Sequence, residues 1–283
     1  MNAFRFYRVR DWVKNTGTLF IGFMCGMHVE ASATHVPYPL LLVLAYLVFA
    51  YMLSFSVNDF FDGRHGNERN YASEYLGRTS KPVAAMLYGI PLTLMALLLC
   101  LTWFVTHSIP LILVMVFPVI LTLAYSIPPF RAKKHFLFSL PLNAACIGVF
   151  QLLAGYLTVT DSINYLIVML SLVYGNYILL HETIHQISHL KDDVNAGVRS
   201  LPSVLGVRET IRMLVLSQLL FSLILLANIM LFHSILPLIP LAFTAFRLKE
   251  VASSSEKTDF TRLRNRLYGI PEGLSYIMFF YLA

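Results

Sequence analysis

Charged residues are scarce in this chain. Only 13% of the 283 residues are Asp, Glu, Lys or Arg, whereas 57% are hydrophobic and the mean hydropathy is +0.68. Soluble globular domains carry roughly 25% charged residues, so this composition excludes an ordinary soluble domain. It also leaves no room for a separate polar domain, and we expect no nucleic-acid partner.

Cysteine is also rare. Cys25, Cys100 and Cys146 are the only three, and all lie in apolar segments. Their positions therefore indicate no disulfide framework and no cysteine metal site. A small-residue cleavage site is missing as well, because the basic, aromatic stretch 1–15 runs directly into apolar sequence. We expect this stretch to be a cytoplasmic leader into a retained span, not a cleaved signal peptide.

Apolar windows of membrane-spanning length are abundant instead. Nine stand out, at 13–29, 38–57, 83–106, 110–126, 139–159, 162–186, 209–233, 235–246 and 267–283. Each span needs about 20 residues, so one bundle uses nearly the whole chain. The sequence therefore predicts an all-α fold. We expect one domain over 1–283, a polytopic membrane bundle of about nine transmembrane helices around a central cavity.

The basic residues are distributed on one side of this predicted bundle. With a cytoplasmic N-terminus, the outer connections are 30–37, 107–109, 160–161 and 234, and none of them contains Lys or Arg. All 21 basic residues then fall on the inner segments. Because the Lys and Arg bias sets membrane orientation, this pattern predicts a multi-pass integral membrane protein with its chemically equipped loops on the cytoplasmic side.

The first candidate site is segment 58–62, which reads Asn-Asp-Phe-Phe-Asp at the end of the second window. If the helix continues through it, Asn58 and Asp62 lie four residues apart and share one face. Ionisable groups at membrane depth are functional candidates, and hard oxygen ligands suit Mg²⁺ bound jointly with a phosphate. The alternative is a solvated helix end whose carboxylates lie near Arg64 and Arg69.

The second candidate site is a polar row at the end of the sixth window. His181, His185 and His189 recur every four residues, and Asp193 extends the row. One helical stripe is therefore polar, and it should line the bundle interior or a wet cavity because it cannot face lipid cheaply. The alternative is a structural network of buried imidazoles.

The third candidate site is the segment 125–134, where two prolines precede three cations. Arg131 with Lys133 and Lys134 supplies the fork-shaped and point-charge donors that a diphosphate needs. The alternative is ordinary positive-inside anchoring, with Tyr125 in the aromatic belt. Taken together, two oxygen-rich sites and a basic site at one membrane depth could hold a diphosphate through Mg²⁺ while its lipid tail lies among apolar helices.

At these residues the sequence resembles the UbiA-type intramembrane prenyltransferase superfamily. Segment 58–62 resembles the family's first Asp-rich motif, 78–82 its Arg/Lys-Pro segment, 125–133 its basic motif and 193–202 the end of its second Asp-rich motif. Segment 12–15 is similar to the start of the family's first helix. The resemblance spans residues 12–202, and nine helices is the family's count.

The chain departs from the family pattern at three positions. The last Asp of the first motif falls at Gly66, and two carboxylates of the second motif fall at Gln186 and His189. Fewer negative charges should weaken Mg²⁺ binding or shift a ligand role to His189.

The resemblance implies a role for each motif. It implies that Mg²⁺ is held by Asn58, Asp62, His189 and Asp193, with Asp59, Asp62 and Asp193 as catalytic residues. The residues implied to bind the isoprenyl diphosphate or the acceptor are Asn15, Arg78, Lys81, Tyr125, Arg131, Lys133, Lys134 and His185. The implied reaction is the transfer of an isoprenyl group to a small aromatic or lipid-like acceptor within the membrane; the acceptor, the prenyl length and the oligomeric state are not encoded in these motifs.

Three other functions stay open at this point. A terpene cyclase of the same family would act on the same prenyl diphosphate. The stretch His181-Glu182-x-x-His185 matches the HExxH helix of zinc proteases, in which two His bind Zn²⁺ and the Glu is the base. A transporter for an anionic lipid or small molecule would use the same polar interior, although carriers place their sites near the membrane midplane.

Overall fold

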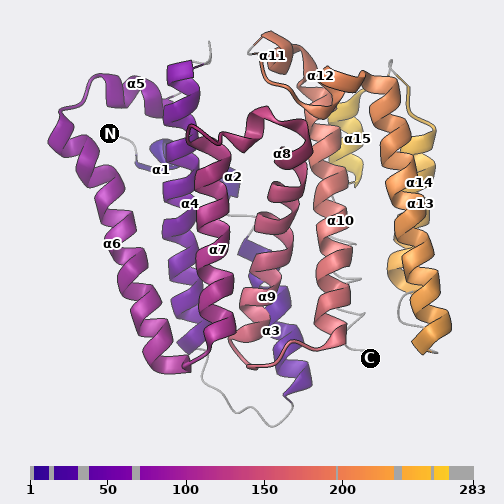
Figure 1. The fold of residues 1–283 in the computed structure, drawn as a ribbon, viewed down its shortest axis with the longest axis horizontal. Coiled ribbons are helices and arrows are strands. Elements are labelled where there is room, and N and C mark those ends of the chain that lie inside the picture. The colour runs from indigo at the N-terminus through magenta and orange to yellow at the C-terminus, as the bar shows by residue number, and fades with distance from the viewer. Residues whose placement is uncertain are drawn as a thin grey trace. The chain divides into compact units, whose positions relative to one another are not determined.

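Helices account for all the regular structure in a computed structural model, which describes residues 3–12, 16–30, 38–65, 71–195, 197–232, 238–255 and 258–267 (Figure 1). No strand occurs in these ranges, which confirms the all-α prediction. The chain divides into two compact units. Unit 1 comprises residues 1–132 and 145–171, and unit 2 comprises 133–144 and 172–283. The predictions of one domain and of a central cavity concern how these units join, and they stay predictions.

Unit 1 is built around one long helix, α4 (Tyr38–His65), which packs against α5, α6 and α7. The other helices of this unit are α1 (Ala3–Phe6), α2 (Val9–Trp12), α3 (Gly17–Val29), α5 (Tyr71–Gly77), α6 (Lys81–Thr106), α7 (Ile109–Ser126) and α9 (Phe150–Leu157). In Figure 1, α5 lies beside the end of α4 that carries segment 58–62 and leads to α6.

The turn from α6 to α7 shows how local sequence sets the helix ends. His107 ends α6 in a left-handed conformation with φ 50°, and the Ser108 hydroxyl accepts a hydrogen bond from the Leu111 amide at 3.4 Å. Pro110 follows in the first turn of α7, where the missing amide hydrogen costs nothing. The tight outer connection predicted at 107–109 is thereby explained.

Glycines let α3 and α9 approach each other closely. A Cβ at Gly155 would lie 1.9 Å from the carbonyl oxygen of Leu19, and a Cβ at Gly22 would lie 1.9 Å from that of Leu152. Small residues permit such backbone contact between membrane helices, where dispersion replaces the hydrophobic effect as the attraction between them.

Unit 2 has its own apolar core. Its helices are α8 (Phe136–Asn143), α10 (Tyr165–Ser188, in unit 2 from Leu172 on), α11 (Leu190–Asn195), α12 (Leu201–Leu205), α13 (Val207–Phe232), α14 (Leu238–Ala252) and α15 (Phe260–Leu267). Leu180 and Ile184 of α10 pack with Leu214 of α13, Val251 of α14 and Leu263 of α15. Between α8 and α9, a π-helical segment (Ala144–Val149) continues the span Phe136–Leu157.

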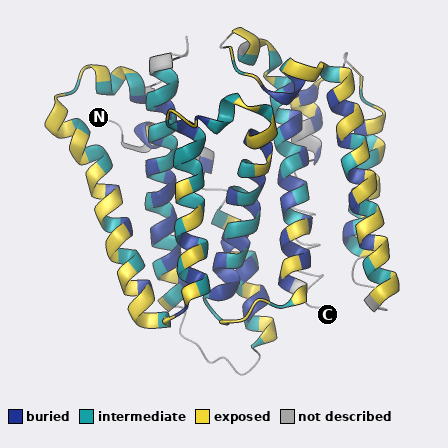
Figure 2. Cartoon of the chain, in the orientation of Figure 1, coloured by how far each residue is buried: buried dark blue, intermediate teal, exposed yellow. Residues whose placement is uncertain are grey.

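Six helices in the described part of the chain are long and apolar enough to cross a membrane, so the protein is an integral multi-pass membrane protein. The outer faces of α6 and α13 carry many exposed apolar side chains, as expected for lipid-facing surfaces (Figure 2). The count of nine spans stays a prediction: α3 and α14 have 13 and 15 residues, and the last window falls outside the described residues apart from Leu267.

One predicted helix end differs from the structure and one condition is met. The second apolar window ends at residue 57, and α4 continues to His65, so segment 58–62 is helical, as its predicted shared face requires. The eighth window was expected to end near Phe246, and this boundary was wrong because α14 continues to Ala252. Arg247 is only 2% exposed, and its guanidinium carbon lies 4.9 Å from the centre of the Tyr177 ring. This cation–π contact lets the helix continue through a charged residue.

Candidate functional site

The first motif lies on one face of α4, as the four-residue spacing predicts. The Asn58 amide donates a hydrogen bond to Asp62 Oδ2 at 3.0 Å. The Asn58 carbonyl oxygen in turn accepts a hydrogen bond from the Ser126 hydroxyl at the end of α7, at 3.1 Å. The first motif is therefore joined to the start of the basic segment 125–134 by side-chain contacts between two helices.

Arg131 completes this contact. Its guanidinium lies 3.4 Å from Asp62 Oδ1 and 3.4 Å from the carbonyl oxygen of Phe61. Arg131 is 8% exposed and adopts φ 37°, a left-handed conformation that non-glycine residues seldom take. Its buried Nε finds no hydrogen-bond partner among the described residues, and burial lowers the pKa of the guanidinium. Asp62 is thus paired with Arg131, whereas the predicted alternative, a solvated helix end near Arg64 and Arg69, stays a prediction because those two side chains lie outside the described part of the chain.

Asp59 has a different partner, which the sequence analysis missed. Arg8, between α1 and α2, lies 3.0 Å from Asp59 Oδ1, and its guanidinium carbon lies 5.2 Å from the centre of the Phe55 ring. Asp59 is 6% exposed, so this ion pair provides the compensation that a buried carboxylate needs. Arg8 also has a positive φ, of 50°. It is one of several basic residues in the leader, and no spacing singled it out.

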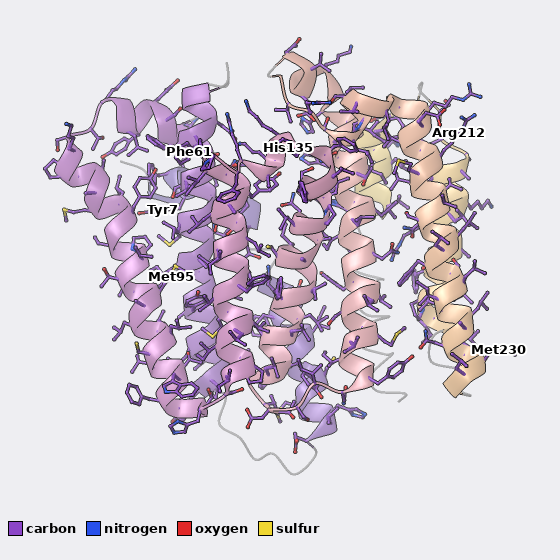
Figure 3. The ribbon with its side chains drawn as sticks, viewed as in Figure 1. Tyr7, Phe61, Met95, His135, Arg212 and Met230 are labelled. Atoms are coloured by element: carbon purple, nitrogen blue, oxygen red, sulfur yellow. The ribbon has the colours of Figure 1, made fainter. Side chains whose placement is uncertain are left out.

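The N-terminal segment that carries Arg8 is packed onto α4 and α6. The Trp12 ring stacks on Tyr51 with 5.3 Å between ring centres and 8° between planes, and its Nε1 donates a hydrogen bond to the Tyr7 carbonyl at 2.7 Å. The Tyr7 hydroxyl donates to the Leu87 carbonyl at 3.0 Å, and burial raises the pKa of Tyr7. Figure 3 labels Tyr7 and Phe61 toward the end of unit 1 at which α5 lies.

The second motif keeps its four-residue register where α10 gives way to α11. The His189 amide donates to the His185 carbonyl at 3.1 Å, and the Asp193 amide donates to the His189 carbonyl at 3.0 Å. The rings of His185 and His189 lie 4.5 Å apart, nearly perpendicular. His189 is exposed and Asp193 is partly buried. The polar row therefore extends over the end of α10, within unit 2.

Gln186 has a structural task in this motif. Its carbonyl oxygen accepts a hydrogen bond from the Leu201 amide at 3.1 Å, and its amide donates to the Ser139 hydroxyl at 3.5 Å. It thereby ties α10 to α8 and to the start of α12. An amide can accept the first bond and donate the second, whereas a carboxylate could keep the second only if the Ser139 hydroxyl donated it.

The HExxH pattern gains no support from its surroundings. Glu182 lies beside its sequence neighbour His181, with 3.7 Å between Oε1 and Nδ1. Across the described ranges, no group of three or more His, Cys, Asp or Glu side chains is placed to hold a metal ion. The third ligand that a zinc protease requires is therefore not among these residues.

The remaining predicted binding residues are distributed over both units. Arg78 and Lys81 flank the start of α6 in unit 1; both are exposed, and neither has an ion-pair partner within the described ranges. Tyr125 lies in the last turn of α7, and Lys133 and Lys134 lie in a 3₁₀ turn (η2, Ala132–Lys134) before α8. The prediction for Asn15 lies outside the described residues.

The donor chemistry of unit 1 fits a hard cation together with an anion. Asn58 and Asp62 offer amide and carboxylate oxygens side by side, which are the donors that Mg²⁺ takes in proteins. The orphaned Nε of Arg131 is a donor suited to a phosphate oxygen. Oxygen ligands and a buried cation are thus brought to one place from segments 68 or more residues apart.

Solved structures with a similar fold include two of a UbiA homolog and one of a synthase. A UbiA homolog from Archaeoglobus fulgidus bound to DMAPP and Mg²⁺ aligns with TM-score 0.69 and 14% identity over 100% of this chain and 98% of its own. The same homolog bound to GPP and Mg²⁺ gives 0.71 and 15% over 100% and 99%. A digeranylgeranylglyceryl phosphate synthase gives 0.68 and 16% over 99% and 98%. At these identities the likeness shows the fold.

Sequence comparison gives the family. No curated protein matches the chain. The sequence profile of the UbiA prenyltransferase family, however, matches residues 19–270, which include both acidic motifs and the basic segment between them. With a match over most of its length and a shared fold, the chain belongs to the UbiA prenyltransferase family.

Proposed function

We propose that this protein transfers an isoprenyl group from an isoprenyl diphosphate to a small aromatic or lipid-like acceptor, in a Mg²⁺-dependent reaction within the membrane. Family membership supports this proposal, and so do the related structures that bind DMAPP or GPP with Mg²⁺. The observation that carries it is the contact of the first motif with the basic segment, through Asp62 with Arg131 and Asn58 with Ser126.

In the proposed site, Asn58 and Asp62 of unit 1 and His189 and Asp193 of unit 2 would hold Mg²⁺, with Asp59 assisting. When bound, the metal would neutralise the diphosphate oxygens and so make diphosphate a better leaving group. Asn58 already directs Asp62 through a hydrogen bond, so its side chain would keep the carboxylate in one orientation.

The cations are proposed to stabilise the charge that grows on the departing diphosphate. Arg131 is fixed in place by its contacts with Asp62 and Phe61, so it needs little reorganisation during the reaction. Arg78, Lys81, Lys133 and Lys134 would add to this field and help to attract the anionic substrate.

The acceptor would meet the allylic carbocation on the apolar side of the motif. Asn15 and Tyr125 are proposed to line its pocket, where aromatic faces would shield the cation from water, and His185 is proposed as a further substrate-binding residue. The one-sided distribution of basic residues supports a cytoplasmic N-terminus and a site that opens to the cytoplasmic side.

Binding of a labelled prenyl diphosphate tests the proposal directly. Purified protein in detergent should bind geranyl or geranylgeranyl diphosphate at least about tenfold more tightly with Mg²⁺ than with EDTA, because the cation neutralises the phosphates. Asp62→Ala should abolish the Mg²⁺ effect. Asp161→Ala removes an exposed carboxylate outside the proposed site and is the matched control. Binding that ignores Mg²⁺ and survives Asp62→Ala would contradict the assignment.

The product would identify the chemistry. Incubation with membranes that contain native acceptors should release diphosphate and yield a product whose mass has increased by the prenyl group. A cyclase would release diphosphate and give a hydrocarbon without an acceptor, and a carrier would move the diphosphate across liposomes unchanged.

A further inference from the structure

The N-terminal segment Ala3–Trp12, which we name the strap, is fastened to unit 1 along its length. Phe6 is fully buried and packs in a cluster with Tyr7 and Ala72 of α5. Farther along, Tyr7 is hydrogen-bonded to α6, and Trp12 stacks on Tyr51 of α4. The strap is therefore held on both sides of Arg8, by Phe6 and Tyr7 before it and by Trp12 after it.

Arg8 places its charge over a single stripe of α4. Tyr51, Phe55 and Asp59 are spaced by four residues and so share one face of the helix. Trp12 covers the first of them, while Arg8 covers the other two through a cation–π contact of 5.2 Å and an ion pair of 3.0 Å. The Asp59 side chain is 8% exposed and that of Arg8 is 39% exposed. Arg8 is thus the group of the strap that pairs with the nearly buried Asp59.

The backbone of Arg8 is held in an unfavourable conformation. Its φ of 50° lies in the left-handed region, which a non-glycine residue keeps only when its surroundings demand it. The ion pair with Asp59, the contact with the Phe55 ring and the packing of the strap on both sides of Arg8 stabilise this conformation. A ligand that binds Arg8 or Asp59 in place of their ion pair removes part of this stabilisation, so the strap is poised to change conformation.

We propose that Arg8 and Asp59 form a latch that fastens the strap over the first motif in the ligand-free protein, and that a magnesium diphosphate opens it. The cation competes with Arg8 for the Asp59 carboxylate, and the phosphate oxygens compete with Asp59 for the Arg8 guanidinium, since guanidinium pairs as readily with phosphate as with carboxylate. Opening the latch uncovers Asp59 next to Asn58 and Asp62. The ligand of this step rests on the proposed function; the latch itself does not.

Trp12 provides a reporter for the strap. The chain has two tryptophans, and the other, Trp103 on α6, is 39% exposed. In a Trp103→Phe background, emission and acrylamide quenching report Trp12 alone. Because Trp12 is 3% exposed, its quenching constant should be low without ligand. Mg²⁺ with inorganic pyrophosphate should raise this constant at least twofold, whereas Mg²⁺ alone or pyrophosphate alone should change it less.

Substitutions at Arg8 and Asp59 distinguish the loss of the latch from a general loosening of the fold. Arg8→Gln and Asp59→Asn should each give the higher quenching constant without ligand, and neither should respond further to magnesium pyrophosphate. Arg8→Lys keeps the charge and should give an intermediate value. Arg212→Gln breaks an exposed ion pair with Glu209 in unit 2 and should behave as the parent. If Arg8→Gln does not fold, the Asp59→Asn and Arg8→Lys results decide the question.

Two outcomes would overturn the latch. One is a ligand-free Asp59→Asn or Arg8→Gln protein whose Trp12 is as protected as in the parent. The other is a parent protein that binds labelled geranyl diphosphate with no change at Trp12. If instead no prenyl diphosphate binds, the proposed function fails, and the ligand-free comparison of parent and variants still decides whether the strap is fastened by Arg8.

Discussion

The two acidic motifs differ in how their polar side chains are stabilised. In unit 1, Asp59 and Asp62 each lie against an arginine from another segment, and both arginines have positive φ. In unit 2, two positions of the second motif carry Gln186 and His189 where the family resemblance implies acids, and Gln186 is joined to α8 and α12 by hydrogen bonds. Substitution of either arginine in unit 1 should therefore leave a carboxylate without its cation, whereas substitutions in unit 2 should alter a hydrogen-bond network.

The largest effect is expected at Arg131. Arg131→Ala removes the cation beside Asp62 and should lower the rate of prenyl transfer by about 10²–10³-fold. This is the usual loss when one fixed hydrogen-bond donor to the developing charge is removed. Steady-state rates with labelled prenyl diphosphate measure this loss.

Arg131→Gly separates charge from backbone strain. Glycine takes φ 37° freely, so this variant should be as inactive as Arg131→Ala but more stable by about 1 kcal/mol. Thermal unfolding in detergent gives the comparison. Near-parental rates in either variant would show that Arg131 only supports the structure.

The next effect concerns packing inside unit 1. Gly155→Ala places a Cβ 1.9 Å from the Leu19 carbonyl oxygen, so α3 and α9 must separate. We expect a loss of about 2 kcal/mol in stability, within the range for overpacked interiors. Gly89→Ala is the matched control on α6, where a Cβ meets nothing within 4 Å and the helix should gain slightly. Equal melting temperatures for the two variants would contradict the close approach.

His189→Asp tests whether the second motif is weak because it lacks a carboxylate. If His189 and Asp193 hold Mg²⁺, a second carboxylate should lower the Mg²⁺ concentration for half-maximal diphosphate binding by about three- to tenfold, because charge count tunes the affinity for hard cations. His107→Asp adds the same charge at an exposed position outside the proposed site. The measurement is a Mg²⁺ titration at a pH where histidine is neutral. An unchanged midpoint for His189→Asp would remove His189 from the ligand set.

Local periodicity predicted part of the site correctly. The shared face of Asn58 and Asp62 follows from helix geometry alone and is confirmed by their hydrogen bond. For Asp62 and Arg131, the sequence predicted only that both lie at the same membrane depth. Their direct contact was not predicted, because it depends on how α7 packs on α4.

Other features depend on tertiary structure that spacing does not encode. Arg8, which has a left-handed backbone conformation between α1 and α2, contacts Asp59, and no sequence motif predicts this conformation or this contact. The end of α14 was placed too early because a hydropathy window stops at a charge, whereas Tyr177 of α10 accommodates Arg247. The approach of the two acidic motifs to one shared cation remains a prediction.

The smallest effect is expected for the hydrogen bonds that join helices inside each unit. In unit 2, Asn176 and Gln218 exchange two amide hydrogen bonds of 3.2 and 3.1 Å between α10 and α13. In unit 1, Ser54 and Thr122 share one of 3.0 Å between α4 and α7, and Thr122 can instead bond the Val119 carbonyl.

A double-mutant cycle with leucine at 176 and 218 should give a coupling of about 0.6 kcal/mol, the average for polar pairs between membrane helices. A cycle with alanine at 54 and 122 should give less, because Thr122 keeps a partner within its own helix when Ser54 is lost. Gln218 is fully buried, so Asn176→Leu alone leaves it unpaired, and this single variant should be less stable than the double leucine variant. The reverse order, with the double variant less stable than Asn176→Leu, would mean that Gln218 is not left unpaired when Asn176 is replaced.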